Sequence, residues 1–319
     1  MTPSRYLLPI ILSVLFTTAA AGCNNGKCKL KEECSSDGDC EGGLHCISCY
    51  VEYYSSSICV RSSLTPHYKH NYSKPFNKYA FLTTHNSYAI EGEPSRTGHT
   101  RLTPTNQEDS ITKQLKNGVR ALMLDPYDFR GDVWLCHGLE GICQNYTAFK
   151  PAVETLKEIE SFLSANKEEV VTLMLEDYVR TSDGGDWPSV KEMIDNNERL
   201  VVFSSNKSKE KNEGIAYQWN CMVETKYGED GILEDGCRHR DGSSKLNDKN
   251  KSLVLLNYFM SVAVKHAACS QNSGDLEDRI KSCYNAAGNR WANFVAVDYY
   301  KRSAGGGPFK AVDTINSRM

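Results

Sequence analysis

Six short apolar runs constrain the fold of this chain more than any other feature. They are YAFLTTH, VRALMLD, VVTLMLED, RLVVFSS, SLVLLNYF and NFVAVDYY, and they lie between residues 79 and 300. Within each run the apolar residues are continuous and do not alternate with polar ones. Continuous runs of this length are typical of parallel strands that are buried on both faces. The sequence therefore predicts a parallel β-sheet.

Helical patterns lie between these runs. Residues 148–169 place apolar side chains on one helical face, and the helix is expected to end at Asn166; the residues are Val153, Leu156, Ile159, Phe162 and Leu163. A second helix is expected in WPSVKEMIDNN, with Pro188 in its first turn. Strands that alternate with helices indicate an α/β fold with βαβ units.

The length of the segment favours a TIM-type (β/α)8 barrel over an open doubly wound sheet. The length of residues 63–319 is close to the ~250 residues of a typical barrel of this kind. An open sheet remains the alternative, but no glycine-rich phosphate-binding turn opens a βα unit here.

The strand ends carry side chains that can take part in catalysis or metal binding. His85, Asn86, Asp125, Glu176 and Asp298 follow apolar runs, and the segment DVWLCHG adds His137. Because the carboxyl ends of barrel strands form the active-site face, we expect these side chains to converge at one mouth. In a closed barrel the last strand lies beside the first, so Asp298 is placed to orient His85.

This set of side chains suits two kinds of chemistry. Two histidines with carboxylates suit general acid–base catalysis near neutral pH. The oxygen atoms of Asn86, Asp125 and Glu176 suit a hard cation. A structural alternative stays open for Asp125 and Glu176, because βα loops often end on an N-capping residue.

The cysteines divide the chain into two parts. Seven of the 13 lie between Cys23 and Cys59, in a stretch with few large apolar residues. Such a stretch cannot build a core and needs disulfides, so residues 23–62 are expected to form a small disulfide-rich module. A redox or metal role for Cys46 and Cys49 is the alternative to a structural one. Seven is odd, so one cysteine of this set is unpaired or reaches the main domain.

For the other six cysteines the sequence suggests pairs of near neighbours. These are Cys136–Cys143, Cys221–Cys237 and Cys269–Cys283, although spacing alone does not fix connectivity. So many cysteines favour an oxidising compartment.

The N-terminus also favours secretion. Residues 1–22 have a basic residue, an apolar stretch too short to span a bilayer and small residues before Cys23, as in a signal peptide. Four N-x-[ST] sequons, beginning at Asn71, Asn145, Asn206 and Asn250, fit a secreted glycoprotein. The net charge of −3 gives no reason to expect a nucleic-acid partner.

Four motifs in order, TTHNSY, RALMLDPYDF, VWLCHG and LMLEDY, resemble the X domain of phosphatidylinositol-specific phospholipase C. The similarity is greatest to the plant-type secreted group, in which a short cysteine-rich segment precedes the domain. The resemblance implies a TIM-like barrel that cleaves the phosphodiester of phosphatidylinositol. It also implies that the inositol 2-hydroxyl attacks phosphorus and that diacylglycerol leaves.

The resemblance also implies roles for individual residues. His85 matches the general base and His137 the general acid, while Asp298 resembles the aspartate that supports the base. The remaining matches are calcium ligands of the eukaryotic enzymes: Asn86, Asp125 and Glu176.

One position departs from the family pattern. Met123 stands where a carboxylate ligand is expected, and a thioether is a poor ligand for Ca²⁺. Three explanations stay open: a weakly held metal with three protein ligands, a nearby cation such as Arg130 or Arg101, or low or absent activity.

Three functions follow, in order of preference. The first is a phosphoric diester hydrolase or lyase that acts on phosphatidylinositol or its headgroup ester, with peripheral membrane contact through apolar residues on the barrel rim. The second is a non-catalytic protein that binds a lipid headgroup or another partner. The third is a related diesterase for another headgroup, such as choline or glycerol.

Overall fold

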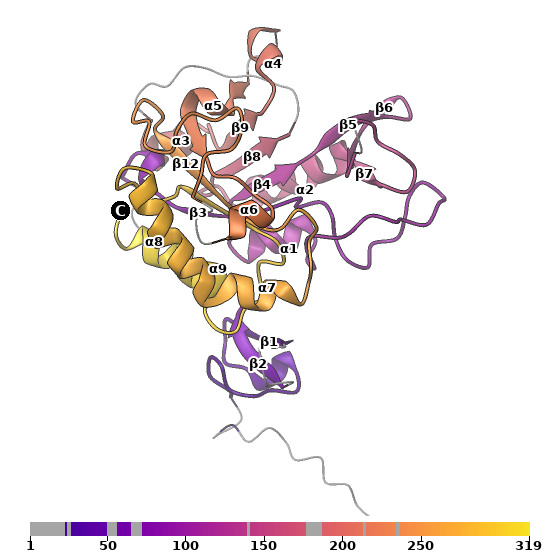
Figure 1. Ribbon diagram of the computed structural model, residues 1–319. Helices are drawn as coiled ribbons and strands as arrows, with labels where there is room; N and C mark the ends of the chain where they lie inside the picture. Colours follow the sequence, from indigo (N-terminus) through magenta and orange to yellow (C-terminus); the bar gives the residue numbers. More distant parts are fainter. Residues whose placement is uncertain are drawn as a thin grey trace, which may run out of the picture.

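The computed structural model describes residues 23, 27–49, 56–64, 72–138, 141–176, 187–212, 215–233 and 237–319. It shows a small N-terminal module below a larger α/β domain (Figure 1). Three parts of the chain that the sequence analysis considered lie outside the described residues: the expected signal peptide, the first residue of the sequon at Asn71, and Asp177, which follows Glu176.

The larger domain is built on an eight-stranded parallel sheet in the order β10-β9-β8-β4-β3-β13-β12-β11. Its strands are β3 (Phe81–Thr84), β4 (Ala121–Leu124), β8 (Val171–Leu175), β9 (Leu200–Ser204), β10 (Ala216–Tyr217), β11 (Met222–Glu224), β12 (Leu253–Tyr258) and β13 (Phe294–Val297). This order is the cyclic order of a barrel, interrupted between β10 and β11, which share no ladder among the described residues. The expected TIM-like fold is confirmed, and β13 pairs with β3.

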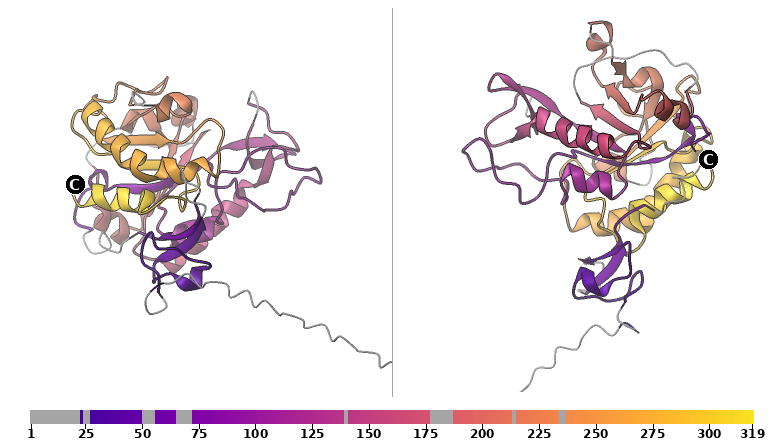
Figure 2. Two further views of the ribbon diagram at one scale, coloured as in Figure 1. Left: turned by 60° about the horizontal axis from the view of Figure 1, so that its bottom comes forward. Right: turned by 180° about the vertical axis from the view of Figure 1, so that it is seen from behind.

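Helices cover the outside of the sheet (Figure 2). They are α1 (Ile111–Lys116), α2 (Ala152–Ala165), α3 (Val190–Asp195), α4 (Lys207–Asn212), α5 (Gln218–Cys221), α6 (Glu229–Ile232), α7 (Ala267–Ser270), α8 (Leu276–Ala286) and α9 (Gly307–Asn316), with a π-helical turn η5 (Gln271–Asp275). Ser189 caps α3 in a capping box with Glu192. Helix α2 accounts for most of the predicted helix at residues 148–169 and ends, as expected, at Asn166.

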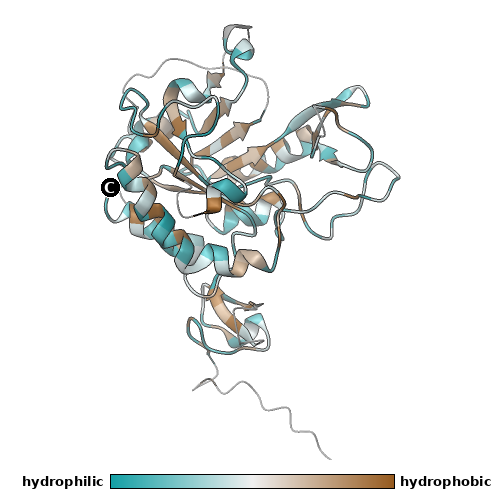
Figure 3. Cartoon of the chain, viewed as in Figure 1, coloured by the Kyte–Doolittle hydropathy of each residue, from teal (hydrophilic) through white to brown (hydrophobic). Residues whose placement is uncertain are grey.

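Alternation along the strands separates the core into two layers. On β4, Ala121 and Met123 point into one apolar cluster, while Leu122 and Leu124 belong to another. The first cluster fills the barrel and the second lies between the barrel and its helices, so the apolar colouring is concentrated on the strands (Figure 3). The residue two positions after an inward-facing residue also faces inward. Asp125 therefore follows Met123 toward the mouth.

A three-stranded antiparallel sheet follows β4 and projects from the barrel (Figure 1). It consists of β5 (Pro126–Phe129), β6 (Asp132–Cys136) and β7 (Ala148–Pro151). DVWLCHG was expected among the barrel strand ends, and this prediction is wrong: His137 follows β6 of the projecting sheet. After β4 the chain does not pass directly to α2 but first turns back at residues 130–131, between β5 and β6.

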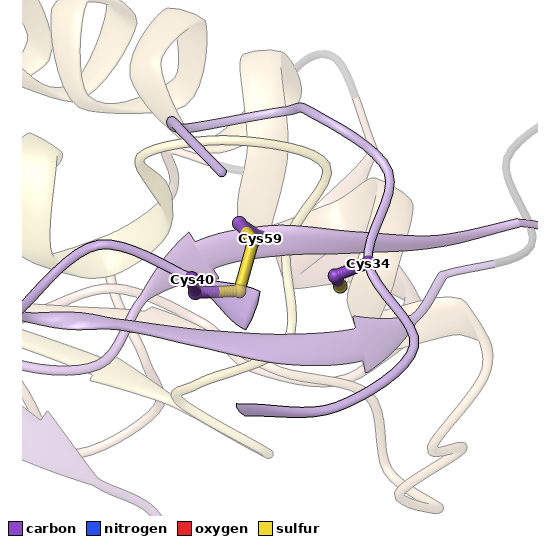
Figure 4. A group of neighbouring side chains, drawn as sticks. All are labelled: Cys34, Cys40 and Cys59. Carbon is purple, nitrogen blue, oxygen red and sulfur yellow. A yellow bond between two sulfur atoms is a disulfide. The ribbon is translucent and has the colours of Figure 1, made fainter. Parts of the chain in front are cut away.

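The cysteine-rich module contains a 3-10 turn η2 (Asp37–Asp39) and the hairpin of β1 (Leu44–Ser48) and β2 (Ser57–Arg61). Its internal disulfides are Cys23–Cys28, Cys34–Cys46 and Cys40–Cys59. The sulfur atoms of Cys34, Cys40 and Cys59 lie close together (Figure 4), but each is bonded to another sulfur. The structural role expected for Cys46 is confirmed.

The structure corrects two of the three pairings expected for the main domain. Cys136–Cys143 is confirmed, but Cys237 pairs with Cys283. Cys269 pairs with Cys49, so the odd cysteine of the module reaches the main domain. Cys221 is buried and takes part in no disulfide in the described part of the chain. Near-neighbour spacing failed here because α8 brings Cys283 to a loop 46 residues earlier.

Among the residues that the structure describes, no helix has both the length and the apolar character needed to cross a membrane.

Candidate active site

Adjacent strand ends bring His85 and Asp298 together at the barrel mouth. His85 directly follows β3 and Asp298 directly follows β13, and the two strands pair in parallel. His85 Nδ1 donates a hydrogen bond to Asp298 Oδ1 at 2.9 Å. The His85 side chain is 17% exposed, so one edge of the ring faces the mouth. Because Nδ1 is engaged, Nε2 is the nitrogen that remains to accept a proton.

Two further residues hold this pair, and sequence reasoning did not identify either. Asn106 is buried and donates through Nδ2 to Asp298 Oδ1 at 2.9 Å. The ring of Phe259, the residue after β12, stacks on the His85 ring with 3.6 Å between centroids. Neither belongs to a recognisable motif. Only the position of Phe259 at a strand end could have indicated it.

Opposing effects set the pKa of His85. Burial, the largest single effect, lowers the pKa of the imidazole, but the charge and hydrogen bond of Asp298 lead the opposing effects, and the net result is a raised pKa of His85. The charges of Asp125 and Glu176 act in the same direction. His85 is thus the more basic of the two imidazoles.

His137 has the opposite character. Asn86 Nδ2 donates to His137 Nε2 at 3.2 Å, and His137 Nδ1 lies 2.9 Å from Thr103 Oγ1. An amide nitrogen can only donate, so Nε2 accepts and the ring is neutral with its proton on Nδ1. Burial lowers the pKa of His137 to about 3, and the positive charges of His85 and Arg101 add to this effect. Asn86, next to His85 in the chain, thus joins the two histidines.

Asp125 and Glu176 lie at neighbouring strand ends, directly after β4 and β8. Burial and the charge of Glu176 raise the pKa of Asp125 to about 7, although Tyr88 donates a hydrogen bond to Asp125 Oδ2 at 3.0 Å. Two carboxylates that repel each other form a donor pair that a hard divalent cation would stabilise. By the chemistry of their oxygen atoms, Asp125 and Glu176 with the Asn86 amide are the residues that would hold such a cation.

Met123 does not join this set. Its side chain is 4% exposed and packs in the barrel interior with Ala121 and Met174. It lies one inward-facing layer below Asp125, so an apolar thioether occupies the place where a fourth ligand was expected.

Arg101, which the sequence suggested as a nearby cation, is close enough to His137 for its charge to lower the pKa of that ring. Arg101 lies over the Phe149 ring and donates to backbone carbonyls, and Arg130 donates to Thr97 O and Asn145 Oδ1. Arg240 instead reaches Glu176 Oε1 at 2.6 Å. It lies in an irregular segment between α6 and β12 and belongs to no motif, so no sequence pattern singles it out.

This geometry defines a class: a TIM-like barrel with a histidine–carboxylate pair and a second histidine at its mouth. The PI-PLC X family model matches residues 72–184 and 177–316. The chain is 43% identical over 334 residues to the PI-PLC X domain-containing protein At5g67130 of Arabidopsis thaliana, covering 97% of this chain and 78% of that protein. The chain therefore belongs to the PI-PLC X domain family.

A solved structure supports the fold. The phosphatidylinositol-specific phospholipase C of Listeria monocytogenes matches with a TM-score of 0.50 and 14% identity, over 78% of this chain and 96% of that one. A Staphylococcus aureus phosphatidylinositol-specific phospholipase C mutant gives a TM-score of 0.49 at 14% identity, with 78% and 95% coverage.

Proposed function

We propose that this protein is a secreted phosphoric diester hydrolase or lyase that cleaves phosphatidylinositol-type phosphodiesters by general acid–base catalysis. The observation that carries the proposal is the arrangement of the two imidazoles at the mouth. Asp298 holds His85 through Nδ1 and leaves Nε2 to accept a proton, and the Asn86 amide contacts the His137 ring. Two imidazoles at one mouth suit general acid–base catalysis. The six disulfides support an oxidising compartment.

In the first step of this mechanism, the inositol 2-hydroxyl attacks phosphorus and its proton passes to His85 Nε2. Asp298 holds the ring through Nδ1 and stabilises the imidazolium that forms. The bond from phosphorus to the glycerol oxygen breaks, and that oxygen takes a proton from His137. The products are a cyclic inositol phosphodiester and diacylglycerol.

His137 must gain a proton before it can act as an acid. In the free protein its pKa is about 3 and Asn86 donates to its Nε2. A phosphodiester anion bound beside the ring would favour the imidazolium. The proposal therefore requires that substrate binding raises the pKa of His137.

A divalent cation held by Asn86, Asp125 and Glu176 would supply positive charge to the transferring phosphoryl group. Ca²⁺ at extracellular concentrations suits a site with few ligands, since such sites bind in the range of about 10⁻⁴–10⁻³ M.

The decisive experiment is a turnover assay of the purified chain on phosphatidylinositol vesicles, in calcium and in chelator. We expect release of inositol phosphate, and we expect His85→Ala and His137→Ala each to reduce it by about 10²-fold or more. A matched control is His99→Ala, because His99 lies on an exposed loop. No turnover in either condition would refute the proposal.

A second candidate, a non-catalytic headgroup-binding protein, is favoured by Met123 and by the neutral state of His137. It predicts vesicle binding that survives both histidine substitutions, without turnover. A panel of choline and glycerol diesters tests the remaining alternative of a different headgroup.

A further inference from the structure

Arg240 is a charged residue at the barrel mouth that takes no part in the proposed catalysis. Its guanidinium bridges two carboxylates, with Nη2 at 2.6 Å from Glu176 Oε1 and Nη1 at 2.8 Å from Glu224 Oε1. The Arg240 side chain is 18% exposed and that of Glu176 is 40% exposed. The bridge therefore joins a partly solvated carboxylate of the mouth to one inside the barrel.

Glu224 holds Arg240 in place, because its own carboxylate accepts several hydrogen bonds. It is fully buried at the end of β11 and accepts hydrogen bonds from Asn257, Gln218 and Trp219 in addition to Arg240. A buried carboxylate with this many donors is held firmly in place. The backbone N–H of Arg240 also donates to Glu224 O at 2.9 Å. Arg240 is consequently fixed on Glu224, and Glu176 is the more easily released partner.

A column of stacked planar groups holds the other side of the guanidinium. Arg240 lies over the Tyr227 ring at 4.9 Å, Tyr227 stacks on Phe259 at 5.7 Å, and Phe259 stacks on His85. This column ties Arg240 to the wall that carries His85. The guanidinium therefore cannot move far when the charge around it changes.

Glu176 is one of the three side chains that fit a divalent cation. A calcium ion bound to its carboxylate at the usual 2.3–2.6 Å would stand about 5 Å or less from the guanidinium nitrogen. Two positive centres at that separation repel each other, and both need the same carboxylate. The cation must therefore displace Glu176 from Arg240 or share it.

We propose that Arg240 competes with a divalent cation for Glu176 and keeps the barrel mouth a weak, low-affinity cation site. This inference concerns the cation site of the proposed function. Only the relevance of Arg240 to catalysis rests on that function. Cation binding itself is measured without substrate, so a protein that turns nothing over can still confirm or refute the role of Arg240.

The experiment is a calorimetric titration of CaCl₂ into the chelator-treated full chain, with MgCl₂ in parallel. The test variant is Glu224→Gln with Arg240→Gln, which neutralises both charges and leaves no buried carboxylate unpaired. We expect its calcium dissociation constant to fall by about tenfold or more relative to the unsubstituted chain. Addition of Glu176→Gln to this variant should abolish the gain.

The matched control is Glu108→Gln with Arg302→Gln, an arginine–glutamate pair joined by bonds of 2.7 and 2.8 Å. Its calcium affinity should equal that of the unsubstituted chain. If the test variant does not fold, Arg240→Lys serves in its place. It keeps a charge for Glu224 but cannot present two separate nitrogen atoms to both carboxylates, so it should also bind calcium more tightly. Unchanged affinity in the folded variant, or a gain that persists without Glu176, overturns the inference.

Discussion

Single side chains at the mouth set the proton affinities of the two histidines. Burial lowers the pKa of both rings, to about 3 for His137, but the charges of Asp298, Asp125 and Glu176 and the hydrogen bond to Asp298 raise the pKa of His85. The largest of these raising effects comes from Asp298. Asp298 is therefore the residue whose removal should change the chemistry most specifically.

We predict that Asp298→Asn lowers the pKa of His85 and moves the acidic limb of the pH profile of kcat/KM to lower pH. The sign follows because His85 must be neutral to act as a base, and loss of the carboxylate makes it easier to deprotonate. The maximal rate should fall by about 10²-fold or more, because the amide no longer fixes the proton on Nδ1. NMR titration of His85 checks the shift without an activity assay. An unmoved titration would contradict the pairing.

For single residues, the sequence predicted neighbours only at strand ends, where the expected strand order places them side by side. His85 and Asp298 were predicted to meet because the first and last strands of a barrel are neighbours, and they do meet. Asn106 and Arg240 were not predictable in the same way. Both lie in irregular loops, where the position of a side chain depends on packing that no local pattern encodes.

Among the elements, long apolar runs were predictable and short strands were not. All six runs became barrel strands. The two strands that were missed, β10 and β11, have two and three residues, too few to show a periodic pattern. The antiparallel insertion was missed for another reason. Its three strands lie between β4 and α2, where the alternation of strands and helices predicted a direct connection.

The π-helical turn η5 supports the end of β13 and thereby the base. Asn272 is buried and donates from Nδ2 to Asp298 O at 2.9 Å and to Tyr299 O at 3.3 Å. We predict that Asn272→Ala lowers kcat about tenfold with little change in KM, because two buried carbonyls lose their donor and the Asp298 backbone shifts. Gln271→Ala, one residue earlier in the same turn, is the control. A loss of thermal stability with an unchanged kcat would show that Asn272 only stabilises the fold.

At the scale of the whole molecule, the cysteine-rich module and the barrel are covalently joined. Cys49 bonds to Cys269 of α7, across a sequence separation of 220 residues. Arg61 pairs with Asp313 of α9 at 2.6 Å, and Arg302 donates to Ser48 O at 3.2 Å. The module lies against the helices at the C-terminal end of the chain in each view (Figures 1 and 2). Sequence spacing could not reveal this link, because its two cysteines become neighbours only in the folded barrel.

We predict that replacing Cys49 and Cys269 together by serine lowers the free energy of unfolding by about 2–5 kcal/mol. A cross-link over so many residues restricts the unfolded chain strongly, and α7 leads directly into the turn that supports Asp298. Denaturant unfolding of the full chain measures the loss. The control replaces Cys34 and Cys46, whose bond closes only a short loop inside the module; it should unfold the module earlier and leave the barrel transition in place. Equal unfolding of the Cys49/Cys269 variant and the unsubstituted chain would mean that the noncovalent contacts alone hold the two parts together.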